Sequence, residues 1–425
     1  MKRTITWFLA LCMTLMLAAC GEHQALQGQT ASQEAERTAG TIAASVPQDE
    51  KAEDPRTAQM IEALREAIGR VDRDKLARML RTEQALRDRV AGMTDAEKVG
   101  QLFFVRCPAR DAASKIAAYH LGGVLLFTQD YRDAGGAWLT REALTDKIAA
   151  FQSAAADDTG IPLFIGSDEE GGTVTRASRN PNLFPAKFPS PQKLWKSGGM
   201  EGLLTETQQY NAALRALGIN VNFAPVCDVS VDPGDFIYDR SFGQSAEATA
   251  DYIAQVVPAM NDAEIGCVLK HFPGYGNNVD THTGIAIDRR AHETFETQDF
   301  LPFAAGIAAG APFVLVSHNV VTSMDAELPA SLSPAVHEEL RALGFTGVAL
   351  TDDLAMDAVA AYAKNGSAAV LAVLAGNDMI VTTDFEHQIP QVLAAVENGT
   401  IPAETLDAAC LRVLRVKLQL GLLEV

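Results

Sequence analysis

Ionisable side chains gather in one short stretch of the sequence, KHFPGYGNNVDTHTG, which covers residues 270–284. Lys270 and His271 open the stretch, and Asp280 and His282 stand near its end. Glycine, proline and asparagine fill most of the space between them, so the composition predicts a loop. A histidine has a pKa near neutrality and can give and take a proton, while a neighbouring aspartate can orient its imidazole. The stretch therefore indicates proton-transfer chemistry.

Other ionisable residues recur directly after apolar runs along the chain. They are Asp168, Glu169 and Glu170 after PLFIG, Asp228 after INVNFAPV, His318 after FVLVS, and Asp352 and Asp353 after GVALT. Any one of them could be a helix cap or a solvated loop residue, but their recurrence favours a common site. The chain has no phosphate-binding loop of the GxxxxGK type, and His271 and His282 alone make a poor metal set. We expect neither a cofactor nor a metal.

The apolar runs have the length of β-strands, and helix-like segments separate most of them. The runs are QLFFV (101–105), GGVLLF (122–127), PLFIG (162–166), INVNFAPV (219–226), GCVL (266–269), FVLVS (313–317), GVALT (347–351) and DMIVT (378–382). Eight strands that alternate with helices predict an α/β fold, the (β/α)8 TIM barrel, whose active site lies at the C-terminal ends of the strands. A doubly wound open sheet is the alternative, although it rarely needs eight such units.

The first twenty residues have the pattern of a bacterial lipoprotein signal peptide. Lys2 and Arg3 precede an apolar segment, residues 5–17, and small residues then lead to Cys20 in the motif LAAC. We expect cleavage before Cys20 and lipidation of its thiol, so that acyl chains anchor the protein to a membrane of the cell envelope. The alternative is a buried apolar helix, but a polar segment follows at once.

Composition divides the rest of the chain. Residues 21–57 are rich in Gln, Glu, Ala, Thr and Ser and predict a disordered tether. Apolar residues at helical spacing predict amphipathic lead-in helices over residues 58–89, and we expect residues 90–425 to form one barrel domain. Four cysteines lie outside the signal peptide in apolar surroundings and indicate buried small side chains, not disulfides or metal ligands: Cys107, Cys227, Cys267 and Cys410.

The overall charge excludes one class of partner. The 425 residues include 35 Lys and Arg against 54 Asp and Glu, a formal net charge of −19. Binding to nucleic acid needs a basic surface that can neutralise phosphates. We therefore expect no nucleic-acid partner, and the sequence leaves the oligomeric state open.

Several motifs resemble those of glycoside hydrolase family 3. They are DEEGGTVTR (168–176), DRSFG (239–243), KHFPGYGNNVDTH (270–282) and TDDLAM (351–356). The segments MTDAEKVGQLFF and LDAACLRVLRVKLQLGLL are similar too, so the resemblance covers roughly residues 90–425. It is strongest to the single-domain β-N-acetylglucosaminidase branch of the NagZ type. Such enzymes use a TIM barrel, a retaining mechanism and no metal.

The resemblance implies roles for particular residues. A retaining glycosidase needs a nucleophile on one face of the anomeric carbon and an acid/base on the other. Asp352 matches the family's nucleophile, and Asp280 with His282 matches its acid/base pair. Asp353 should face away from Asp352 and serve as a cap or a backbone tie, because neighbouring side chains of an extended segment point to opposite faces. The sugar-binding residues carried over are Asp168, Arg176, Arg240, Lys270 and His271.

Two departures from the family pattern fall in the loop that carries the acid/base. Tyr275 stands where the family usually has histidine, and the segment before Asp280 is about one residue shorter. We expect His318 to be a hydrogen-bonded histidine of the barrel mouth, and Asp228 to be a support residue.

The resemblance implies a retaining exo-β-N-acetylglucosaminidase that removes terminal GlcNAc from peptidoglycan fragments or related oligosaccharides. Three alternatives stay open. One is a β-glucosidase or xylosidase on the same scaffold. Another is a phosphorylase, since a neutral histidine base repels phosphate less than a carboxylate does. The third is a wall-binding lipoprotein without catalytic activity.

Overall fold

The computed structural model describes residues 73–278, 286–355, 359, 362 and 367–424. The predicted signal peptide, Cys20, the tether and much of the lead-in segment lie outside these ranges, as do Asp280 and His282. The chain divides into two compact units, residues 1–89 with Val425 and residues 90–424. Within the described ranges, no helix is both long enough and apolar enough to cross a membrane.

Parallel strands form the centre of the larger unit. Its described residues contain β1 (Phe103–Arg106), β2 (Gly123–Leu126), β3 (Phe164–Ser167), β4 (Val221–Asn222), β5 (Gly266–Phe272), β7 (Phe313–Val316), β9 (Val348–Thr351) and β10 (Ile380–Thr382). They pair in the order β10-β1-β2-β3-β4-β5-β7-β9, and a parallel bridge between Leu350 and Met379 joins the two ends of this order. The predicted (β/α)8 barrel is therefore confirmed. The open sheet is wrong, because an open sheet would leave two edges unpaired.

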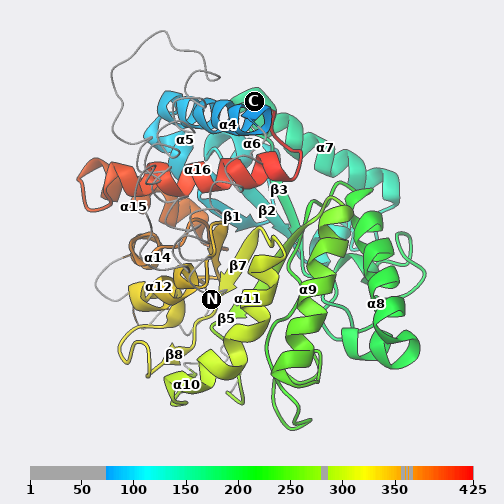
Figure 1. Cartoon of the computed structure of the whole chain (residues 1–425). Coiled ribbons are helices and arrows are strands. Elements are labelled where there is room, and N and C mark those ends of the chain that lie inside the picture. The colour runs from blue at the N-terminus through cyan, green and yellow to red at the C-terminus, as the bar shows by residue number, and fades with distance from the viewer. Residues whose placement is uncertain (1–72, 279–285, 356–358, 360–361, 363–366, 425) are drawn as a thin grey trace, which may run out of the picture. The chain divides into compact units, whose positions relative to one another are not determined.

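Helices connect successive strands and pack around them (Figure 1). The helices of the described ranges are α4 (Arg73–Gly92), α5 (Asp95–Gln101), α6 (Ala112–Ala118), α7 (Arg141–Asp158), α8 (Pro191–Arg215), α9 (Ala246–Asp262), α10 (His292–Thr294), α11 (Phe300–Ala308), α12 (Pro334–Ala342), α14 (Ala368–Ala375), α15 (Phe385–Glu397) and α16 (Ala403–Gln419). Hydroxyl side chains begin several of them: Ser190, Ser245 and Ser333 cap the first turns of α8, α9 and α12. In Figure 1, α9 lies between α8 and α11 and contacts both.

Aromatic side chains fill the barrel interior. The rings of Phe164 and Phe313 meet edge to face at 5.1 Å, and those of Phe104 and Phe223 do so at 5.3 Å. Gly166 gives this layer its room, because a Cβ atom there would lie 2.7 Å from Phe104 Cζ. Val413 and Val416 of α16, and Leu420 directly after it, belong to the same buried cluster. Because the strands are buried on both faces, they appear in the sequence as continuous apolar runs.

The prediction of a loop from residue 270 onward is wrong at its start. Lys270 and His271 belong to β5, which continues to Phe272. Lys270 forms a parallel bridge with Val226, and Phe272 pairs with Val316 of β7 after a register shift. Pairing on both sides thus extends the strand into a segment whose composition favours a turn. The peptide bonds Lys270–His271 and Phe272–Pro273 are cis.

Two smaller features complete the fold. A second sheet pairs β6 (Ile287–Asp288) with β8 (Val320–Val321), short segments that follow β5 and β7 in the chain and were not predicted. The four cysteines outside the signal peptide are free and buried, which confirms the prediction made from their apolar surroundings.

Candidate active site

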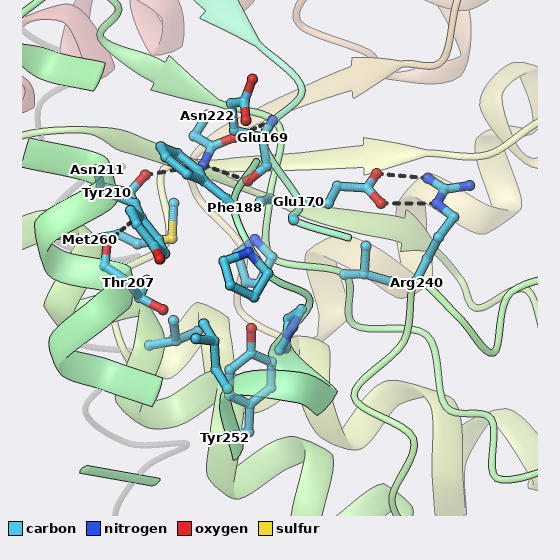
Figure 2. Close-up of a pocket in the computed structure, with 18 residues that line it drawn as sticks. Glu169, Glu170, Phe188, Thr207, Tyr210, Asn211, Asn222, Arg240, Tyr252 and Met260 are labelled. Carbon is cyan, nitrogen blue, oxygen red and sulfur yellow. Dashed lines mark hydrogen bonds and ion pairs between the residues drawn. The ribbon is translucent and has the colours of Figure 1, made fainter. Parts of the chain in front are cut away.

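Charged residues meet at the C-terminal ends of β3, β4 and β5. Glu170 follows β3, Arg240 lies in the long segment after β4, and Lys270 belongs to the end of β5. Arg240 Nε and Nη2 donate to the two carboxylate oxygens of Glu170 at 2.9 and 2.8 Å, the bidentate pair drawn in Figure 2. Lys270 Nζ lies 2.6 Å from Glu170 Oε1. The Glu170 and Lys270 side chains are only 2% and 3% exposed, so solvent screens these contacts little.

The charges around Glu170 determine its ionisation. Burial alone would raise the pKa of this carboxyl, but Arg240 and Lys270 outweigh that effect and hold the pKa well below its usual range. Glu170 is therefore an anion at neutral pH. It fixes the positions of two cations whose remaining N–H groups can donate to a ligand.

Asp168 joins the same network from the other side of Lys270. Lys270 Nζ donates to Asp168 Oδ1 at 3.0 Å, and Arg176 Nη2 lies 3.6 Å from Asp168 Oδ2. The Asp168 side chain is 15% exposed, and the Arg176 side chain is 21% exposed. The structure thus brings the predicted sugar-binding residues Asp168, Arg176 and Lys270 together, and Asp168 and Arg176 keep part of their surface open to a ligand.

The hydrogen bonds of His271 determine its tautomer. Arg240 Nη2 lies 3.0 Å from His271 Nε2, and a guanidinium can only donate, so Nε2 must accept. The proton of the neutral ring then lies on Nδ1, which donates to Asp228 Oδ2 at 2.8 Å. His271 is therefore a neutral link between Arg240 and Asp228 in this arrangement, and not a proton donor toward a ligand.

Asp228 supports this end of the barrel, as predicted. The Asp228 side chain is fully buried, and its Oδ2 also accepts from the backbone N–H of His271 at 3.2 Å. Its Oδ1 accepts from the backbone N–H of Tyr275 at 2.7 Å. Tyr275 is buried, and its ring meets the His271 ring edge to face at 5.4 Å. The residue that departs from the family pattern is thus packed against a predicted sugar-binding residue.

Asp352 lies directly after β9. Its backbone N–H donates to the carbonyl of Val316 at 3.1 Å, so the barrel hydrogen-bonding pattern reaches this residue. Its Oδ1 accepts from the backbone N–H of Asp353 at 2.8 Å. The Asp353 carboxylate accepts from the N–H and the hydroxyl of Thr383, at 3.2 and 3.0 Å. Asp353 is the backbone tie that the sequence predicts, and Asp352 lies at the strand end expected for a nucleophile.

His318 is held by hydrogen bonds on both ring nitrogens. Nε2 lies 3.1 Å from the carbonyl oxygen of Asp353, and Nδ1 lies 2.7 Å from Ser331 Oγ. The prediction of a hydrogen-bonded histidine at the barrel mouth is confirmed. By fixing the carbonyl of Asp353, His318 also restrains the backbone next to Asp352.

The roles of Glu169 and Glu170 were not predicted from the sequence. The triplet of acidic residues after β3 was visible, but the sequence does not tell which of the three faces the Arg240 guanidinium. Glu169 points elsewhere: its carboxylate accepts from the N–H groups of Arg176 and Ser178, at 2.5 and 3.2 Å, and from the Ser178 hydroxyl at 2.8 Å. Burial raises the pKa of Glu169 to about 7. This residue holds the segment that carries Arg176.

A small cavity lies beside the ion pair between Glu170 and Arg240. Its volume is about 40 Å³, and Figure 2 shows Tyr210, Tyr252 and Met260 among the side chains that line it. These residues come from α8 and α9. The space suits one or a few water molecules and is too small for a sugar ring. The cavity is therefore not the sugar site.

Arg290 joins the segments before and after the predicted acid/base. It donates to the Asp288 carboxylate at 2.7 to 3.1 Å and to that of Asp299 at 2.9 and 3.1 Å. It also donates to the carbonyl of Gly274 at 3.2 Å. Asn278 Nδ2 donates to Asp288 Oδ2 at 2.7 Å. The two ends of the loop are thus tied to one charged cluster.

Comparison with known families gives this site its context. Residues 94–416 match the family described as "Glycosyl hydrolase family 3 N terminal domain". The chain belongs to glycosyl hydrolase family 3. The match spans all the strands of the barrel, from β1 to β10. The resemblance noted in the sequence motifs is therefore confirmed at the level of the family.

Relatives of this family 3 glycosyl hydrolase carry related names. "Beta-hexosaminidase LpqI" of Mycobacterium tuberculosis is 30% identical over 76% of this chain and 83% of its own length. "Beta-hexosaminidase A" of Pseudoalteromonas piscicida is 29% identical over 72% of this chain, which spans about half (54%) of that relative. A solved family 3 β-N-acetylglucosaminidase from a Paenibacillus species superimposes with a TM-score of 0.71 and 32% identity, covering 78% of this chain and 63% of that one.

Proposed function

We propose that this glycoside hydrolase is a retaining exo-β-N-acetylglucosaminidase. It would remove terminal, β-linked GlcNAc from peptidoglycan fragments or related oligosaccharides. One observation carries the proposal: the network of Asp168, Glu170, Arg240, Lys270 and His271 at one mouth of the barrel that also holds Asp352. The names of the relatives support GlcNAc as the sugar.

The network suits a neutral sugar ring. Asp168 can accept hydrogen bonds from two hydroxyl groups at once, while Lys270 and Arg176 donate to hydroxyl or acetamido oxygens. These groups are fixed by one another before a ligand arrives, so little conformational entropy is lost on binding. An exo-acting enzyme needs such a rigid site for one terminal ring.

The chemistry proceeds in two steps. In the first, a carboxylate oxygen of Asp352 attacks the anomeric carbon, the bond from that carbon to the glycosidic oxygen breaks, and the leaving oxygen takes a proton from the His282 imidazolium. In the second, water attacks the same carbon and gives a proton to the neutral His282. The bond to Asp352 then breaks, and GlcNAc leaves with its β configuration retained. Asp280 orients His282 and stabilises its charged form.

The first experiment tests the nucleophile with an aryl β-GlcNAc substrate. We expect Asp352→Ala to lower kcat by about four orders of magnitude, because no covalent intermediate can form. Asp384→Ala is the control, since Asp384 is a half-exposed aspartate that also follows a strand, and it should retain wild-type activity. Wild-type turnover by Asp352→Ala would contradict the assignment. Parallel assays with aryl β-glucosides and β-xylosides, with and without phosphate, separate the alternative activities.

The second experiment tests the acid. Protonation matters most when the leaving group is a poor one. We expect His282→Ala to slow hydrolysis of an alkyl β-GlcNAc far more than that of a dinitrophenyl β-GlcNAc. Equal losses on both substrates would show that His282 does not donate the proton.

We also propose that the protein acts in the cell envelope, anchored by acyl chains on Cys20. The support is the pattern of the first twenty residues, with a basic start, an apolar segment and small residues before the cysteine. A peptidoglycan substrate lies in the same compartment.

A further inference from the structure

The barrel mouth carries an exposed aromatic side chain that the reaction above does not use. Phe236 lies in the segment after β4 and is 39% exposed, among the most exposed of the large apolar residues in the described ranges. A single exposed apolar residue is ordinary on a protein surface. Its surroundings make Phe236 different, because hydrogen bonds and burial hold the residues on both sides of it, and because one aromatic ring separates it from the sugar-binding network.

The backbone on both sides of Phe236 is fixed. Asp235 Oδ2 accepts from the hydroxyl of Ser230 at 2.7 Å. Ile237 is completely buried, and its carbonyl accepts from the N–H of Arg240 at 3.0 Å. Phe236 therefore stands between two anchored residues, in the segment that supplies Arg240 to Glu170. Binding of a ligand against the Phe236 ring would therefore cost the protein little conformational entropy.

Ring contacts connect Phe236 to the sugar-binding network. The Phe236 ring lies 5.7 Å from the Tyr275 ring, and the Tyr275 ring lies 5.4 Å from the imidazole of His271. Tyr275 is buried, whereas Phe236 at the outer end keeps part of its surface open to solvent. The row of rings thus runs from a residue of the sugar network to an exposed aromatic surface at the rim.

We propose that Phe236 forms a binding subsite for the aglycone, with a pyranose ring as its ligand. The inference rests on the proposed function and names the part of the substrate that lies beyond the cleaved bond. One side of a pyranose ring presents C–H groups, which the electron-rich face of an aromatic ring attracts. The exposed part of the Phe236 ring suits such a ligand.

The test compares two GlcNAc donors that differ only beyond the cleaved bond. β-GlcNAc fluoride has a leaving group too small to reach Phe236, whereas the β-1,4-linked GlcNAc disaccharide has a pyranose aglycone. We expect Phe236→Ala to lower kcat/KM for the disaccharide about five- to tenfold and to leave the fluoride within about twofold of wild type. Phe236→Tyr keeps the aromatic ring and should have a kcat/KM for the disaccharide close to that of the wild type. Val231→Ala, a more exposed apolar residue of the same segment, is the control and should change neither value.

Four outcomes are distinguishable. A loss confined to the disaccharide and restored by tyrosine supports the subsite. Equal losses on both donors would overturn it, because Phe236 would then only support the network through Tyr275. No loss on either donor would overturn it as well. If the wild type cleaves glucosyl donors instead, the proposed sugar is wrong. The effect of Phe236→Ala on kcat/KM can then be compared between cellobiose and glucosyl fluoride, and this comparison still tests the subsite.

Discussion

At the scale of single residues, charge balance explains why this site can be so deeply buried. Glu170 and Asp168 supply two negative charges, and Lys270 and Arg240 supply two positive charges, within direct hydrogen-bonding distance. Buried charges are tolerated when they are paired and hydrogen-bonded, but removal of one partner leaves the others uncompensated. Besides the sugar-binding role that we propose for it, the network should therefore have a large influence on stability.

Glu170→Gln tests that influence. It keeps the shape of the side chain but leaves Lys270 and Arg240 without their shared anion, and we expect the free energy of unfolding to fall by about 3–5 kcal/mol. Glu386→Gln is the matched control, because the Glu386 carboxylate pairs with Lys115 at an exposed site and such pairs contribute less than about 1 kcal/mol. Urea denaturation of the two variants measures the difference. Similar losses for both would contradict the uncompensated-charge argument.

Glu169 gives the protein a pH dependence of stability. Burial raises the folded-state pKa of Glu169 from an ordinary 4.5 to about 7. Between these values the folded state holds a proton that the unfolded state releases, so stability falls as pH rises from about 4.5 to 7. The glutamine of Glu169→Gln cannot titrate. Over this pH range, the free energy of unfolding of the variant should therefore fall by on the order of 2 kcal/mol less than that of the wild type. Urea denaturation at several pH values measures this difference. If the free energy of unfolding depends on pH in the same way in wild type and variant, Glu169 is not the group responsible.

At the scale of elements, the apolar runs were sufficient to predict every strand of the barrel, because strands buried on both faces leave a continuous signal. The end of β5 was not predicted, because proline and glycine near Lys270 and His271 favour a turn. The bridge from Lys270 to Val226 and the pairing of Phe272 with β7 extend the strand instead. The pairing of Glu170 with Arg240 could not be predicted from the sequence either. Arg240 lies 70 residues away in the chain, and only the closed barrel brings the two together.

The segment before the proposed acid/base depends on a glycine. Gly274 has a φ of +127°, and a Cβ atom there would lie 2.2 Å from Asp299 Oδ1, inside the cluster around Arg290. We expect Gly274→Ala to cost about 2–4 kcal/mol of stability and to lower activity at least about tenfold, since it displaces the segment before His282. Gly399→Ala is the control: its φ is +77°, but the new Cβ atom would meet nothing within 4 Å. Thermal melting and the aryl β-GlcNAc assay compare the two, and equal effects would exclude the steric explanation.

At the scale of the whole molecule, the chain combines a barrel with a separate N-terminal region. The barrel carries the site and matches a family, so its sequence motifs could be interpreted residue by residue. The first twenty residues carry their information in order and composition alone, and they predict processing, not a fold. The two parts therefore require different experiments.

Metabolic labelling in a bacterial host tests the anchor. An azido-palmitate label should mark the wild type, and Cys20→Ala should lose the label and move the enzyme from the membrane fraction to the soluble fraction. Its specific activity should not change, because the barrel is separate in sequence. Cys12→Ala removes a cysteine inside the predicted signal peptide and should leave labelling intact. Label retained by Cys20→Ala would contradict the lipidation site.

The continuous network from Asp168 to Asp228 also has an evolutionary consequence. Lys270, Arg240 and His271 each contact two members of the network, so the effect of replacing one residue depends on the identity of the others. Stepwise adaptation to a new sugar would therefore meet strong epistasis, and intermediates would be poorly folded. Phe236 meets Tyr275 through a ring contact, and among the described residues its side chain has no hydrogen bond or ion pair with the network, so we expect its replacement to depend less on the other members. Among relatives, preference for the aglycone should drift more readily than preference for the terminal sugar.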